Sequence, residues 1–189
     1  MSLRKQIIKR PVITTVEVLV KPVSSKNDMF FTGFVHKPYP PIYLELSRNA
    51  QFNSATVIRG TEGGIIPSLR QTGKVHFYHG AGEQDDYYDI TPEDLGIVQS
   101  SRAVDIPEEI TRKNTKDKIE SKVDAVDIAK ETIKSGISAL SGNDGPMLSC
   151  IQLGAAIILQ RATGNDLGNC SKEVLRVLKS GAALKRIKR

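Results

Sequence analysis

Apolar residues occur in short runs in the first half of this 189-residue chain and with a helical period in the second half. Four runs rich in β-branched and aromatic residues predict strands, at 29–35, 55–59, 74–79 and 85–90. Between the first two, Pro41 can occupy the first turn of a helix over about 41–51. A strand, a helix and a strand in this order favour parallel pairing through a crossover connection. The pattern therefore predicts an α/β fold, with a mostly parallel central sheet flanked by helices.

The apolar period of the second half predicts helices over 123–140 and about 146–162. The second of these is apolar on most of its sides, which is typical of a deeply buried helix. Asp144 stands just before it and can cap its first turn. Ser171 indicates the start of a further helix that continues to about Lys179.

Two stretches interrupt these elements. Gly181 is expected to separate the last helix from a final basic turn, and the charged residues 105–122 have no sustained apolar period. A surface loop or an exposed helix is expected over 105–122. We expect residues 1–28 to form a basic N-terminal segment and residues 29–189 to form one α/β domain.

The composition is that of an ordinary globular protein, with 39% hydrophobic and 25% charged residues. No apolar run reaches the roughly 18–20 residues that cross a bilayer, and no signal peptide precedes the first strand, so a cytoplasmic location is expected. The two cysteines, Cys150 and Cys170, have no metal-ligand spacing and are expected to be reduced thiols.

The net charge of +6 is concentrated at the two ends of the chain. Residues 1–26 hold six Lys or Arg and one acid, residues 172–189 hold seven and one, and the segment between holds fourteen and nineteen. Two solvated termini would explain this pattern, and so would an anionic partner such as single-stranded DNA or RNA. In the second case the cations that would neutralise phosphates are Lys5, Lys9, Arg10, Lys185, Arg186, Lys188 and Arg189.

A glycine-rich turn follows the second predicted strand, in the sequence V-I-R-G-T-E-G-G-I-I-P-S over 57–68. Gly60, Gly63 and Gly64 permit positive φ angles or a close approach of the backbone to a ligand. Arg59 and the turn would lie at the carboxyl end of a strand, where backbone N–H groups can bind an anion. A tight turn with a purely structural role is the alternative.

Polar groups near the other strand ends give weaker indications. His36 ends the first predicted strand, where α/β sheets bind ligands, although a polar strand end before a proline turn would look the same. Tyr87 and Tyr88 could stack on bases. The acidic cluster at Asp85, Asp86 and Asp89 is either a cation site or a solvated loop.

These segments together resemble glycosyltransferase family 3, which contains anthranilate phosphoribosyltransferase. The glycine turn is similar to the family's G-E-D-G-x-D-E turn, and D-I-T-P-E-D-L-G-I over 89–97 is similar to its T-P-E-D-F-G-L. The segments K-R-P-V-I-T-T over 9–15, 29–45 and L-K-S-G-A-A-L over 178–184 extend the resemblance to about residues 8–187. The resemblance implies the C-terminal α/β half of a larger ancestor, without the family's helical N-terminal domain.

The resemblance also implies site residues. Arg10 would match the arginine that the family uses near the anthranilate carboxylate, and the substrate-binding set would be Arg10, His36, Arg59, Gly60 and Gly63. The two family carboxylates that hold Mg²⁺ fall on Ile65 and Ile66, which offer no oxygen ligand. No catalytic residue, metal ligand or cofactor is therefore assigned to this chain.

Two functions remain open at this point. The first is a phosphoribosyltransferase polypeptide of tryptophan biosynthesis, which transfers phosphoribosyl from phosphoribosyl pyrophosphate to an aromatic amine or base. It would be inactive alone, because the family's G-T-G-G-D loop and K-H-G-N segment do not occur here, and would need a separate N-terminal half. The second is a non-catalytic nucleic-acid-binding protein, which the R-G-T-E-G variant of the turn resembles. The resemblance also implies a homodimer, because helices of this family commonly pair subunits, and no membrane association is expected.

Overall fold

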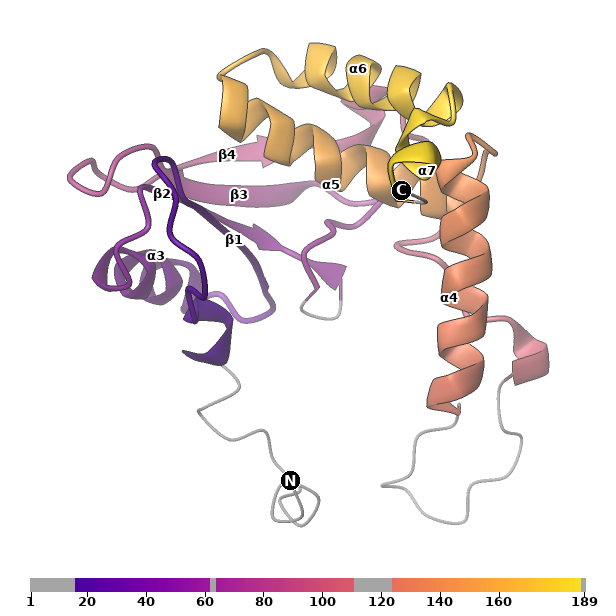
Figure 1. Cartoon of the computed structure of the whole chain (residues 1–189), viewed down its shortest axis with the longest axis horizontal. Helices are drawn as coiled ribbons and strands as arrows, with labels where there is room; N and C mark the ends of the chain where they lie inside the picture. The colour runs from indigo at the N-terminus through magenta and orange to yellow at the C-terminus, as the bar shows by residue number, and fades with distance from the viewer. Residues whose placement is uncertain (1–15, 62–63, 111–123, 188–189) are drawn as a thin grey trace. The chain divides into compact units, whose positions relative to one another are not determined.

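The computed structural model describes residues 16–61, 64–110 and 124–187 (Figure 1). The chain divides into two compact units. Unit 1 comprises Met1–Ile65 and Lys74–Tyr88, and unit 2 comprises Ile66–Gly73 and Asp89–Arg189. No helix among the described residues is long and apolar enough to cross a membrane.

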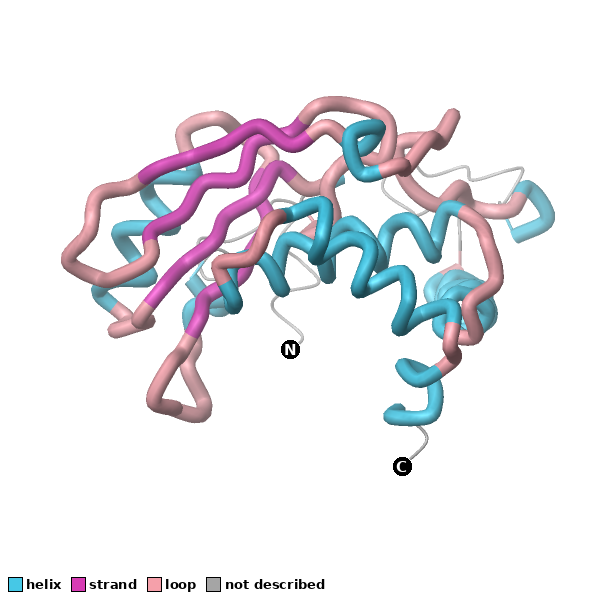
Figure 2. The backbone as a smooth tube through the Cα atoms, turned by 90° about the horizontal axis from the view of Figure 1, so that it is seen from above, coloured by secondary structure: helices cyan, strands magenta, loops and turns pink. Residues whose placement is uncertain are grey.

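Four neighbouring strands form one sheet in the order β1-β2-β3-β4 (Figure 2). Their bounds are Met29–Phe34 (β1), Ser54–Arg59 (β2), Gly73–Tyr78 (β3) and Asp86–Ile90 (β4). Each lies within two residues of the predicted strand, and the α/β class is confirmed.

Parallel pairing occurs between β1 and β2, as predicted, with Phe34 opposite Arg59. Strand β3 pairs with β2 in the antiparallel sense, with Val57 opposite His76, so the sheet is mixed and not mostly parallel as predicted. Parallel strands need a crossover that carries the chain back along the sheet, usually a helix. Helix α3 (Tyr39–Asn49) is that crossover between β1 and β2, whereas no α-helix occurs among the described residues between β2 and β3.

The core of unit 1 lies between α3 and one face of the sheet. The helix begins at Tyr39, two residues earlier than predicted, with Pro40 and Pro41 in the first turn, where a missing N–H costs no hydrogen bond. Leu44 is 1% exposed and packs into a cluster of Phe30, Phe34, Ala55, Val57 and Tyr78. The 3₁₀ helix η1 (Glu17–Leu19) adds Leu19 to this cluster.

Unit 2 is built around α5 (Pro146–Thr163), which lies beside α6 (Leu167–Lys179) in Figure 1. The predicted deep burial of α5 is confirmed, since Leu153, Ala156 and Ile157 have no exposed surface. Other elements of the unit are α4 (Ala125–Leu140), α7 (Ala182–Ile187), η3 (Pro92–Leu95) and η4 (Glu108–Ile110). Both cysteines are buried free thiols, and burial raises the pKa of the Cys150 thiol.

The start of α5 at Pro146 is as predicted, but its predicted cap and the predicted start of α6 are wrong. Gly145, not Asp144, precedes the first turn of α5, and the Asp144 carboxylate pairs with Lys179 Nζ at 2.6 Å. Helix α6 begins at Leu167, because Asp166 caps it by accepting a hydrogen bond from the Asn169 N–H at 2.9 Å. Ser171 is a buried residue within that helix.

Gly142 and Gly164 form a matched pair for a stability test, because both have positive φ, 86° and 72°. A Cβ at Gly142 would lie 2.9 Å from Lys179 Cα, whereas nothing lies within 4 Å of a Cβ at Gly164. We expect Gly164→Ala to cost about 1 kcal/mol from the left-handed backbone alone, and Gly142→Ala about 2–3 kcal/mol. Urea unfolding checks the difference, and equal costs would show that the contact with α6 contributes nothing.

Candidate functional site

The glycine turn begins where β2 ends, at Arg59. A Cβ at Gly60 would lie 1.4 Å from the Gly64 carbonyl oxygen, so the two backbones touch and position 60 requires glycine. The Gly64 N–H donates to the Thr61 carbonyl at 2.9 Å and closes the turn. Gly63 lies outside the described residues. Backbone packing by itself thus explains Gly60, and anion binding by the turn stays a prediction.

His36 and Arg59 lie at the same edge of the sheet, as the sequence predicted. Parallel pairing puts Phe34 opposite Arg59, and His36 follows two residues after Phe34. Both side chains are exposed, and the His36 ring lies 6.0 Å from the Tyr39 ring. Their assignment as substrate contacts stays a prediction, and Arg10 lies outside the described residues.

Of the seven basic residues assigned to phosphate binding, the structure describes two. Lys185 and Arg186 are exposed on the last turn of α7, which Gly181 separates from α6 as predicted. The other five lie outside the described residues: Lys5, Lys9, Arg10, Lys188 and Arg189.

The acidic cluster is partly engaged in structural contacts. Asp85 accepts a hydrogen bond from Arg48 Nη2 at 2.6 Å, and the same guanidinium donates to the Ala81 and Glu83 carbonyls. Asp86 accepts from the Tyr87 N–H at 2.7 Å. Among the described residues, no group of three or more His, Cys, Asp or Glu is arranged to hold a metal ion.

Sequence reasoning missed a row of aromatic rings on one face of the sheet in unit 1. The His76 ring lies between Phe34 and Tyr87, with centroid distances of 5.6 and 5.7 Å. Lys74 Nζ lies 3.9 Å from the centre of the Tyr87 ring. The alternation in K-V-H indicates that Lys74 and His76 share a face of their strand. It does not indicate that Tyr87 lies beside them, because that depends on how β3 pairs with β4.

No protein-family model and no curated protein matches this chain. Solved structures do. Anthranilate phosphoribosyltransferase from Saccharomyces cerevisiae in complex with 4-fluoroanthranilate matches 99% of the chain, with a TM-score of 0.71 and 15% sequence identity. The same enzyme in complex with PRPP and Mg matches 99%, with a TM-score of 0.70 and 15% identity.

This chain has the fold of anthranilate phosphoribosyltransferase. It spans about half of that enzyme, 48% of its length. The resemblance read from the sequence is thereby confirmed at the level of the fold. At 15% identity, the likeness does not extend to substrate or activity.

The residues after the glycine turn do not fit the Mg²⁺ that anthranilate phosphoribosyltransferase holds in that complex. The resemblance places Ile65 and Ile66 where the metal carboxylates would stand, and Ile65 is 49% exposed. Mg²⁺ takes oxygen ligands, which aliphatic side chains cannot supply. We therefore derive no reaction step through a metal at this turn.

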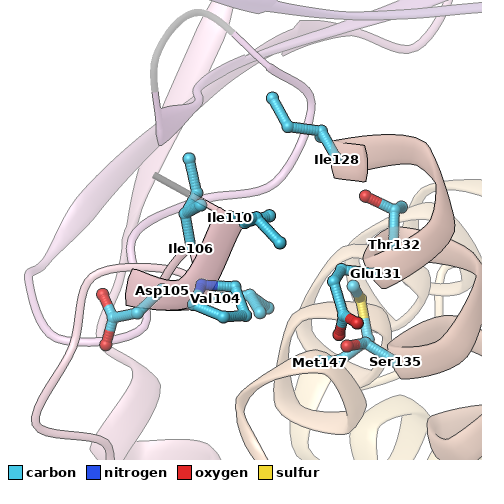
Figure 3. A pocket seen from close by; sticks show the side chains of 10 residues that line it. Val104, Asp105, Ile106, Ile110, Ile128, Glu131, Thr132, Ser135 and Met147 are labelled. Carbon is cyan, nitrogen blue, oxygen red and sulfur yellow. The ribbon is translucent and has the colours of Figure 1, made fainter. Parts of the chain in front are cut away.

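A cavity of about 240 Å³ lies within unit 2, beside the start of α4 (Figure 3). Ile106, Ile110 and Ile128 make much of its wall, and Glu131 adds a carboxylate. An apolar wall with a negative charge is unsuited to a pyrophosphate group. Residues 111–123, which join η4 to α4, lie outside the described residues, and we assign no site here.

Proposed function

We propose that this chain is a non-catalytic protein that binds single-stranded nucleic acid on an anthranilate phosphoribosyltransferase scaffold. The observation that carries the proposal is the pair Ile65 and Ile66 after a glycine turn whose backbone still closes tightly through Gly60. By the resemblance, Ile65 and Ile66 stand where the family has its oxygen donors. Such a chain can still attract phosphates, but it has no means at this turn of holding the metal ion for the reaction.

The chemistry of phosphoribosyl transfer explains why this replacement matters. Negative charge develops on the departing pyrophosphate, and it must be stabilised by preorganised cations or a metal ion. Nucleic-acid binding requires no such stabilisation, because exposed cations bind the phosphates by releasing counterions. Lys185 and Arg186 on α7, together with Arg59 at the sheet edge, are exposed cations of this kind.

A second candidate is a phosphoribosyltransferase polypeptide of tryptophan biosynthesis that becomes active with a separate N-terminal half. The match to an enzyme structure in complex with PRPP and Mg, of which the chain spans 48%, favours this candidate. It would act in the cytoplasm, in keeping with the two free cysteines, and a homodimer is compatible with either function.

A salt titration separates the two candidates. Binding of a fluorescein-labelled oligothymidylate of about 20 nucleotides is followed by anisotropy from low to high salt. The logarithm of the affinity is expected to fall linearly with the logarithm of the salt concentration, with a slope of about −0.7 for each phosphate contacted. Replacing both Lys185 and Arg186 by Gln should reduce the slope by about one to one and a half.

The control replaces Lys130 and Lys134 by Gln, because these α4 lysines are also exposed but form ion pairs with Asp127 and Glu131. The slope should then stay within error of the parent chain. In parallel, the protein is incubated with phosphoribosyl pyrophosphate, Mg²⁺ and anthranilate. Turnover by the chain alone would overturn the proposal in favour of the enzyme. Oligonucleotide binding whose affinity does not depend on salt concentration would support neither function and would overturn the proposal as well.

A further inference from the structure

Helix α4 presents a stripe of apolar side chains to solvent. Val126, Ile133 and Ile137 are 61%, 61% and 47% exposed. Their spacing puts them on one face of the helix, which we call the outward stripe. Ile128 and Ser135 line the cavity of unit 2, and their positions along the helix put that cavity on the opposite side. The outward stripe is therefore a second apolar face of α4.

Helix α4 packs against its own unit mainly at its C-terminal end. Among the residues of α4, all of which the structure describes, Ala139 alone is buried, in a cluster with Leu148 of α5 and Leu178 of α6. The N-terminal turns extend away from these two helices (Figure 1). An isolated helix of this length is marginal in water, because most helical stability comes from the packing of an apolar face. A partner on the outward stripe would supply that packing.

The surroundings of the stripe favour another helix as its partner. Ala129 and Gly136 lie along one edge of the stripe, and a Cβ at Gly136 would meet nothing within 4 Å. Small side chains beside open space let two helices approach closely. A lipid surface fits less well, because Asp124, Asp127 and Glu131 outnumber the two lysines of α4. Helices that lie on membranes are instead rich in Lys and Arg.

The other edge of the stripe carries charges that complement one another when the helix is reversed. Asp127 and Lys134 lie on this edge, two turns apart. Lys130 shares the face of the stripe, but its Nζ extends to Asp127 at 3.3 Å. Lys134 is 78% exposed, and its pair with Glu131 in the same helix is long at 3.6 Å, so it can also meet a second carboxylate.

An antiparallel second copy of α4 satisfies the charges and the apolar stripe in one register. Asp127 of each protomer then lies level with Lys134 of the other, whereas a parallel copy would bring like charges together. The same register puts the partner's Val126 level with Ser135, between Ile133 and Ile137. The two apolar stripes therefore interdigitate.

We propose that a second copy of this chain docks on the outward stripe, with the two α4 helices antiparallel. The proposal stands apart from the nucleic-acid-binding function, and it names a surface and an orientation for the homodimer. One helix face about 24 Å long and about 10 Å wide offers less than the roughly 800 Å² per partner that stable complexes bury. The dimer is therefore weak, with an expected dissociation constant of about 10–100 μM.

Sedimentation velocity of the full chain, from about 2 to about 500 μM, measures the association. Ile133→Glu puts a charge in the middle of the stripe and should weaken the dimer at least about tenfold, since that carboxylate would be buried without a partner. The matched control is Val98→Glu, because Val98 is 78% exposed and lies outside α4. It should leave the dissociation constant within about twofold of the parent. Circular dichroism of each variant checks that it is folded.

Charge reversal tests the orientation. Asp127→Lys and Lys134→Asp should each weaken the dimer about three- to tenfold, because each puts like charges level with one another. The double variant should return to within about twofold of the parent, since the opposite charges meet again in reverse.

Three results would overturn the proposal. A parent chain that stays monomeric over the whole range would exclude the dimer. A dimer that persists in Ile133→Glu, or that is lost equally in Val98→Glu, would show that the contact lies on another surface or with another partner. A double variant as weak as the single ones would exclude the antiparallel arrangement.

Discussion

Replacing Tyr78 by leucine is expected to destabilise the folded protein by about 3–4 kcal/mol. The side chain is 1% exposed in the core of unit 1. Its hydroxyl group donates to the Phe52 carbonyl at 3.1 Å and lies 3.1 Å from Ser47 Oγ, while the Arg48 guanidinium lies 4.2 Å from the ring centre. Leucine leaves a cavity and unsatisfied polar groups together, and each adds to the cost. Urea unfolding followed by circular dichroism measures the loss.

A second substitution at Tyr78 separates the contribution of the cavity from that of the lost hydrogen bonds. Tyr78→Phe keeps the ring and removes only the hydroxyl group, so about 1–2 kcal/mol should be lost. The matched control is Tyr87→Phe, which removes a hydroxyl group from a residue that is 57% exposed and should change stability by less than about 0.5 kcal/mol. If Tyr78→Phe cost no more than Tyr87→Phe, the buried hydrogen bonds would have no net effect on stability.

Tyr78 also shows where prediction from the sequence reached its limit. The strand that carries it was predicted from the alternation in K-V-H-F-Y-H, but burial in β3 alternates only as far as Phe77, because Tyr78 is buried as well. Its partners Ser47 and Phe52 come from α3 and the loop after it, 31 and 26 residues away in the chain. Alternation fixes which residues share a face of a strand, whereas the residues they meet depend on tertiary packing.

The positions of the four strands were predicted correctly, whereas the direction of their pairing was predicted only in part. The crossover helix between β1 and β2 was predicted from Pro41 and the apolar period after it, and the parallel pairing of the two strands followed from that helix. The glycine turn of 60–64 was interpreted as a functional loop, and its consequence for the strand after it was missed. A link without a helix returns the chain antiparallel, which changed the sense of β3.

The candidate site shows the same limit. His36 and Arg59 were predicted at strand ends because each directly follows a run of apolar residues, and the structure puts both there. The contacts of the Phe34, His76 and Tyr87 rings depend on the registers of several strand pairs. A shift of one residue in any of these pairs would move a side chain to the other face. Composition suggested a nucleic-acid partner through the charged ends, and Tyr87 was considered as a stacking residue, but only the structure shows that its ring meets that of His76.

Gly60→Ala is the second substitution with a large expected effect, about 2–4 kcal/mol. A Cβ at this position would lie 1.4 Å from the Gly64 carbonyl oxygen, a distance that no rotamer change can relieve because both groups belong to the backbone. The turn must therefore open, and the hydrogen bond from the Gly64 N–H to the Thr61 carbonyl is lost with it. Thermal and urea unfolding should both report the loss.

Gly82→Ala is the matched control, because nothing lies within 4 Å of a Cβ there and its φ is not positive. It should be neutral or slightly stabilising, since alanine has fewer unfolded conformations to lose.

The two variants also separate the roles of the turn. If Gly60→Ala lost stability but kept the salt-dependent affinity for oligothymidylate, the turn would hold the end of β2 and bind no phosphate. If affinity fell further than the replacement of Lys185 and Arg186 by Gln lowers it, while the circular dichroism spectrum of the folded state stayed unchanged, the backbone of the turn would be part of the anion site. Stability and binding both equal to those of Gly82→Ala would show that the close approach of Gly60 to Gly64 does not exist in solution.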